Sequence, residues 1–102
     1  MTTAEIEKSI LTNIEFSITK MQEFLKVEKR IDVSKLTEED YKDLYERAIR
    51  EVKLEFISDK YNLYHDEILI ERFTKFYNIL IETKAVSEFG LEYTDEQEIL
   101  NE

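Results

Sequence analysis

Proline is absent from the 102 residues, and glycine occurs once, at Gly90. These two residue types disfavour a helix interior most, so almost nothing in the chain would interrupt an α-helix. Cysteine is also absent, which excludes disulfide bonds, thiolate metal ligands and a cysteine nucleophile. A single glycine excludes a glycine-rich phosphate-binding loop. These absences predict an all-α chain and remove several classes of active site.

Histidine is nearly absent as well, because His65 is the only one in the chain. Acidic residues follow it at Asp66, Glu67 and Glu71, which raises the hypothesis of a metal site. Helical metal sites pair histidines with carboxylates at fixed spacings, and that spacing is missing here. We therefore interpret the segment as a surface turn that leads into a helix cap, and we expect neither a metal nor another cofactor.

A second acidic cluster raises an enzyme hypothesis. Asp40, Asp43 and Glu46 lie three residues apart on a predicted helix, and all-α nucleotide pyrophosphatases hold magnesium with carboxylates on helices. Those enzymes carry paired motifs, and the second motif is missing here. The better interpretation is an acidic helix start, so we expect no enzyme activity and no catalytic residues. A metal-dependent pyrophosphatase is the third and least supported function.

The residues that are present suffice for one hydrophobic core. Apolar residues make up 42% of the chain, including 12 isoleucines, 6 phenylalanines and 6 tyrosines, whereas disordered acidic chains are poor in these types. A chain of 102 residues suits one domain. The periodicity predicts a single helical domain, 1–102, built as a small antiparallel bundle of three long helices plus a short C-terminal helix. The predicted helices span about 3–29, 38–58, 66–89 and 95–100.

The first predicted helix carries its apolar residues at spacings of three and four, which places them in one seam that faces the core. The seam consists of Ile10, Leu11, Ile14, Ile18, Met21 and Leu25. At 100° per residue, Phe16 and Val27 fall on the opposite side, and Phe24 lies at the edge. These three side chains are therefore candidates for an exposed apolar patch.

The second predicted helix begins with a strong start signal at Thr37 and Asp40. Thr37 suits the N-cap position, and Asp40 suits the carboxylate position of a capping box. Acidic residues in the first turn also favour the positive end of the helix dipole. The stripe that faces the core consists of Tyr41, Leu44, Tyr45, Ala48, Val52 and Phe56.

The third predicted helix is apolar on two sides. One side consists of Leu69, Phe73, Phe76 and Leu80, and the far side consists of Ile68, Ile79 and Val86. Either the C-terminal helix covers the far side within the chain, or another protein chain covers it, and the sequence leaves both open. Gly90 marks the end of this helix, because glycine adopts the left-handed conformation of a helix terminator without a side-chain penalty.

The net charge of the chain limits the classes of molecule that we expect it to bind. The net charge is −10 and the isoelectric point is about 4.6, and from Ala85 onward there are six acidic residues and no basic one. Such a surface repels phosphate, which disfavours direct nucleic-acid binding. No apolar run approaches the ~20 residues of a membrane span, and the first residues do not resemble a signal peptide. We expect a soluble, cytoplasmic protein with no membrane partner.

The apolar residues outside the predicted core and the excess of acidic over basic residues together predict a function in protein binding. Charge can accelerate the encounter with a basic protein, and apolar side chains can hold the complex. We expect a non-catalytic regulator or inhibitor of a basic protein, such as a nucleic-acid-handling enzyme, of the kind that phages and plasmids carry. The candidate partner-binding residues are Phe16, Phe24, Val27, Tyr61, Tyr64, Ile68, Ile79, Val86, Glu92, Asp95, Glu96 and Glu98.

The alternative function is a self-associating helical subunit of a larger assembly. In that case the seam of the first helix and the far side of the third helix would form symmetric contacts, with a homodimer as the simplest product. No residue motif in the chain identifies a family.

Overall fold

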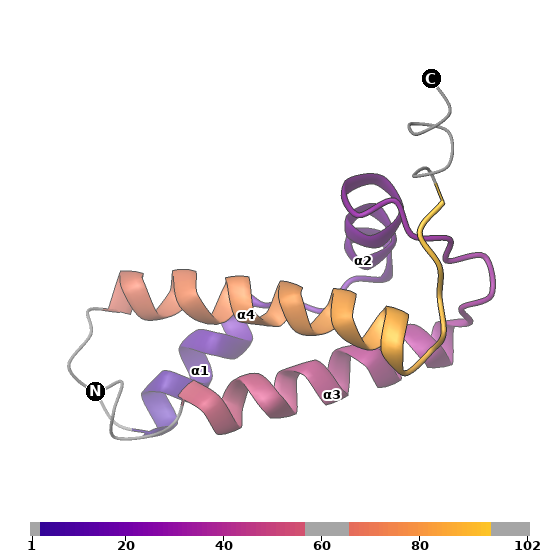
Figure 1. Ribbon diagram of the computed structural model, residues 1–102. Coiled ribbons are helices and arrows are strands. Elements are labelled where there is room, and N and C mark those ends of the chain that lie inside the picture. Colours follow the sequence, from indigo (N-terminus) through magenta and orange to yellow (C-terminus); the bar gives the residue numbers. More distant parts are fainter. Residues whose placement is uncertain (1–2, 57–65, 95–102) are drawn as a thin grey trace.

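The computed structural model describes residues 3–56 and 66–94 of the chain (Figure 1). In these residues the helices are α1 (Thr3–Asn13), α2 (Ile18–Gln22), the π-helix η1 (Glu23–Glu28), α3 (Glu38–Phe56) and α4 (Asp66–Ser87). The described part of the chain contains no β-strand beyond one isolated antiparallel bridge between Ile31 and Tyr93. The predicted all-α class is confirmed.

The helices α3 and α4 lie side by side and antiparallel, and α1 packs against both of them (Figure 1). The short α2 continues directly into η1 at the end of the molecule where α3 begins and α4 ends. Buried side chains come from every one of these segments and form one core, and several of them are fully buried. The largest of them are Ile10, Leu25, Ile31, Leu44, Val52, Phe73 and Ile81.

The prediction of one continuous first helix over 3–29 is wrong. The chain leaves the helical conformation after Asn13 and re-enters it at Ile18, and its last six helical residues form the π-helix η1. Ser17 is extended and caps α2, because its hydroxyl accepts a hydrogen bond from the backbone N–H of Lys20. Thr12 and Asn13 donate side-chain hydrogen bonds to carbonyls one turn earlier. Such bonds compete with a continuing helix.

A contact with α3 also stabilises this break. The Tyr45 hydroxyl donates a hydrogen bond to the Ile14 carbonyl at 3.1 Å, just after the end of α1. The ring of Phe16 packs on the ring of Tyr45, with centroids 4.8 Å apart. The break therefore half-buries Phe16 and brings both Ile14 and Met21 into the core.

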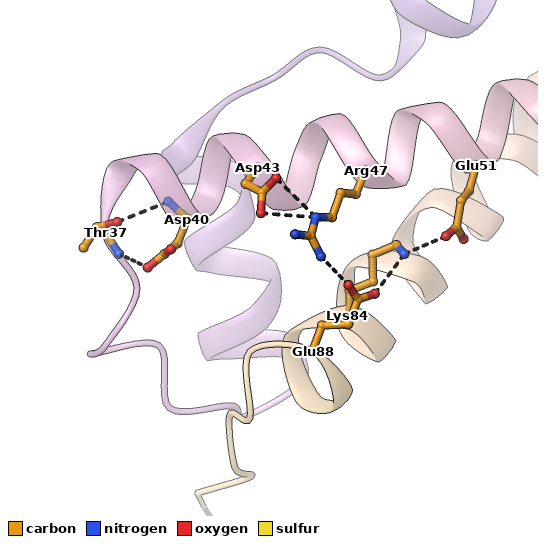
Figure 2. Close-up of polar contacts among 7 residues, drawn as sticks. All are labelled: Thr37, Asp40, Asp43, Arg47, Glu51, Lys84 and Glu88. Atoms are coloured by element: carbon orange, nitrogen blue, oxygen red, sulfur yellow. Dashed lines mark hydrogen bonds and ion pairs between the residues drawn. The ribbon is translucent and has the colours of Figure 1, made fainter.

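The start of α3 is confirmed as predicted. The Asp40 N–H donates to the Thr37 hydroxyl at 3.2 Å, and the Thr37 N–H donates to the Asp40 carboxylate at 2.9 Å (Figure 2). This reciprocal pair is a capping box that satisfies two backbone donors of the first turn. The helix continues to Phe56, so the last two predicted residues, 57–58, lie outside the described residues.

The end of α4 confirms the terminator predicted at Gly90, although the helix stops at Ser87, two residues before the predicted end. Gly90 is left-handed, with φ of 68°. The Leu91 N–H then donates to the Ala85 carbonyl at 3.0 Å, which turns the Leu91 side chain into the core. The predicted helix over 95–100 lies outside the described residues.

The end of η1 repeats this arrangement with a different residue. Arg30 takes the left-handed position, with φ of 56°, and the following Ile31 N–H donates to the Leu25 carbonyl at 2.8 Å. An arginine in this conformation costs roughly 1 kcal/mol relative to glycine. Burial of Ile31, which is 1% exposed, offsets that cost.

The segments that follow the two terminators pair with each other. The Asp32 N–H donates to the Glu92 carbonyl at 2.9 Å, and the Thr94 N–H donates to the Arg30 carbonyl at 2.7 Å. The Thr94 hydroxyl adds a third bond to the same carbonyl. This pairing ties the exit of η1 to the exit of α4.

Candidate functional site

A groove of about 610 Å³ runs between α1 and α3. Its lining residues are Glu7, Leu11, Tyr45, Glu46, Ile49, Arg50, Lys53 and Leu54. Ile49 is buried and Tyr45 is half-buried, so these two side chains connect the groove to the core. Burial also raises the pKa of Tyr45, which keeps its hydroxyl protonated as a hydrogen-bond donor.

Two leucines on the groove remain in solvent. Leu54 is 75% exposed, more than any other large apolar side chain that the structure describes, and Leu11 is 42% exposed. An exposed leucine by itself is common on protein surfaces. Here the two leucines line one concave surface, and that combination is typical of a site that another molecule covers.

The position of Leu54 follows from the period of α3. Val52 is fully buried, and a residue two positions further along an α-helix is rotated by about 200°, to the opposite side. The position of Leu11 corrects the predicted seam. Ile10 is fully buried, whereas its neighbour Leu11 is 42% exposed and lines the groove.

The charges on the rim of the groove are balanced. Glu7 of α1 and Lys53 of α3 form an ion pair across it at 2.7 Å. Glu46 and Arg50 also line the groove, and neither makes an ion pair with any residue in the described part of the chain. The rim therefore offers one free acid and one free base to a bound molecule.

The side of α3 that faces α4 carries charges that are already paired (Figure 2). The Lys84 ammonium donates to Glu51 at 2.7 Å and to Glu88 at 3.0 Å. Arg47 contacts Glu88 as well and pairs with Asp43 at 3.2 Å. The hydrogen bond from Lys84 is the main cause that lowers the pKa of the Glu88 carboxyl. This network joins α3 to α4, and its charged groups pair with each other, so few of them are available to bind a ligand.

A smaller cleft of about 150 Å³ lies where the break after α1 faces α4. Phe24, Met21, Tyr77 and Ile81 contribute its apolar wall. Burial raises the pKa of Tyr77, so its hydroxyl stays neutral. This volume is below the ~300 Å³ at which small-molecule sites begin.

The predicted binding residues that the structure describes lie on different elements and differ in exposure. Val27 on η1 and Ile79 on α4 are 65% and 59% exposed, and neither lines the groove between α1 and α3. Ile68 is also exposed, at 40%. Glu92 is exposed, and its backbone carbonyl accepts the bond from Asp32.

Three other predicted residues are half-buried. Phe16, Phe24 and Val86 all pack against the core, so they are less available than the sequence pattern predicts. The Lys29 ammonium also lies 5.7 Å from the centre of the Phe24 ring. The remaining predicted residues, Tyr61, Tyr64, Asp95, Glu96 and Glu98, lie outside the described residues.

The groove was not predicted from the sequence. One signal for it was present, because Leu54 falls outside the stripe of α3 that faces the core. A second signal was the adjacent pair Ile10 and Leu11, since neighbouring side chains on a helix point about 100° apart. Neither signal indicates that α1 and α3 lie next to each other.

Among residues 3–56 and 66–94, no cluster of histidine and acidic side chains could hold a metal ion. Of the three acidic residues considered for magnesium, Asp40 serves the capping box and Asp43 pairs with Arg47. No helix in the same residues combines the length and apolar character of a membrane span. No family model, curated protein or solved structure matches the chain.

Proposed function

We propose that this protein is a non-catalytic interaction module that binds another protein through the groove between α1 and α3. The observation that carries the proposal is the exposure of Leu54 and Leu11 on one concave surface. Covering a leucine side chain contributes roughly 1.5–3 kcal/mol. Two such anchors, with a floor that is part of the core, are enough to dominate a small interface.

The net charge supports a basic partner. At −10, the chain attracts a positively charged protein over a distance of about one Debye length, and this attraction raises the association rate. The rim of the groove does not repel such a partner, because Glu46 can pair with a basic side chain of the partner and Arg50 with an acidic one. The net charge thus accelerates the encounter with the partner, and the leucines stabilise the complex. These two roles suit a regulator or inhibitor of a basic, nucleic-acid-handling protein.

The test compares two apolar positions that are similarly exposed. Leu54→Gln and Val27→Gln each remove one exposed apolar side chain and leave the net charge at −10. The two variants and the unaltered protein serve as baits for affinity capture from a lysate of the source organism, followed by mass spectrometry and by binding measurements on the purified captured protein. We expect a basic protein that the unaltered bait and Val27→Gln retain and that Leu54→Gln binds about 30-fold more weakly.

The opposite pattern would move the contact elsewhere. Retention by Leu54→Gln together with loss by Val27→Gln would assign binding to the outer side of η1, as the sequence pattern predicts. A partner with an acidic surface would contradict the role given to the net charge.

A further inference from the structure

We infer that, in the absence of its partner, a second copy of this chain covers the groove between α1 and α3. This inference rests on the proposed function, since it takes the groove as the contact surface and adds what regulates access to it. The charges on the rim of the groove favour a second copy of the chain as the occupant.

The rim is complementary to itself. It contains two acids, Glu7 and Glu46, and two bases, Arg50 and Lys53. In a symmetric dimer, the same patch of each chain faces its partner, so every group on one rim meets the rim of the other copy. A rim of one sign would repel its own copy, whereas a rim with equal numbers of each sign can pair acids with bases in both directions.

The balance matters more because the chain as a whole is strongly acidic. Two molecules with a net charge of −10 repel each other over most of their surfaces. At a distance beyond about 8 Å this repulsion is screened at physiological salt, so the charges at the contact decide whether two copies can join. The groove combines a rim of zero net charge with two exposed leucines, Leu11 and Leu54.

The dimer would regulate the proposed function by mass action. A second copy and a basic partner need the same leucines, so only one of them can occupy the groove. Self-association therefore lowers the fraction of grooves that are free as the protein accumulates, and a partner competes with the second copy for each groove.

The first test is sedimentation of the purified full chain at several concentrations. We expect a reversible monomer–dimer equilibrium for the unaltered protein and a dimer about 1,000-fold weaker for Leu54→Gln, because a symmetric dimer then loses both leucines. Ile79→Gln is the matched control, because Ile79 is exposed at 59% and does not line the groove. It should dimerise like the unaltered protein. A monomer at all concentrations up to the millimolar range would overturn the inference.

The second test inverts one free charge of the rim at a time. The variant Glu46→Lys leaves two free bases on the rim, and the variant Arg50→Glu leaves two free acids, while the ion pair between Glu7 and Lys53 stays intact in both. Each alone should remain monomeric because like charges then face each other, and an equimolar mixture should form a one-to-one dimer. Dimerisation of either variant alone, to the extent of the unaltered chain, would show that the rims do not meet. Circular dichroism checks that both variants stay helical.

These results separate the inference from the proposed function. A monomeric protein that still captures a basic partner through Leu54 overturns only the dimer. A dimer that forms through the groove, with no partner that depends on Leu54, overturns the proposed function and keeps the self-associating alternative.

Discussion

The two sides of α3 use their charged residues in different ways. Toward α4, Arg47 and Glu51 are paired with side chains of the neighbouring helix, and Lys84, which pairs with Glu51, is buried. Toward α1, Glu46 and Arg50 have no ion pair in the described part of the chain, and Leu54 remains in solvent. One side of the helix therefore holds the fold together, and the other is available for contact.

The difference teaches that stability and binding can be changed independently on one helix. Residues between α3 and α4 should affect unfolding, and residues on the groove should affect association. Three substitutions test that separation.

The largest effect is expected where α3 and α4 share aromatic side chains. Phe73 is 1% exposed, and its ring centroid lies 5.5 Å from that of Phe56. Phe73→Ala should lower the free energy of unfolding by about 3–5 kcal/mol, because it removes buried apolar surface and leaves a cavity. Urea unfolding monitored by circular dichroism measures this loss. A loss below about 1 kcal/mol would mean that the packing between these two helices does not hold the fold.

A smaller loss is expected in the charge network. Lys84→Met keeps most of the buried aliphatic chain and removes the hydrogen bonds to Glu51 and Glu88. The free energy of unfolding at pH 7 should fall by about 1–2 kcal/mol, since hydrogen bonds of charged groups contribute on this scale and both carboxylates can turn to water. The same urea experiment applies, and Lys75→Met, at an exposed position of α4, is the control.

The pH dependence identifies the cause of that loss. Lys84 lowers the pKa of Glu88 below its ordinary value of 4.5, so this contribution is present above pH 4.5 and is lost as the pH falls through the lowered value. The pKa of Lys84 is raised above 10.5, mainly by Glu51, so its contribution is lost only as the pH rises beyond that value. The difference between Lys84→Met and the unaltered protein should therefore shrink below pH 4.5. A constant difference from pH 7 to pH 3 would assign the loss to packing.

The smallest effect on stability is expected at the groove. Leu54→Gln replaces an exposed leucine by a residue of similar helix propensity. The free energy of unfolding, measured on dilute protein so that self-association does not contribute, should change by less than about 0.5 kcal/mol. A loss as large as that of Lys84→Met would show that the two sides of α3 are not separate.

The sequence predicts local features of the fold better than contacts between helices. The capping box of Thr37 and Asp40 and the terminator at Gly90 depend on residues within one turn, and both are confirmed. The break after Asn13 depends in part on Tyr45, which lies 31 residues beyond the carbonyl that it binds. No periodicity within the first segment could indicate that contact.

The same limit applies to the candidate site. Val27 was predicted to lie on the side opposite the core, and Ile79 on the far side of its helix, where the sequence left open what covers it; both are exposed. Leu11 was assigned to the core because its spacing to Ile14 and Ile18 fits a straight helix, yet the chain turns between these residues. A groove is formed by two helices together, so it becomes visible only when their mutual arrangement is known.

The pairing of Arg30 and Asp32 with Glu92 and Thr94 sets an order of events during synthesis. Ile31 and its neighbours cannot complete their native hydrogen bonds until residue 94 has left the ribosome, when the earlier helices have already been exposed for some time. The hydrogen bonds of Arg30 and Asp32 therefore form only after residues up to 94 have been synthesised, and a chain shortened before Glu92 would lack them.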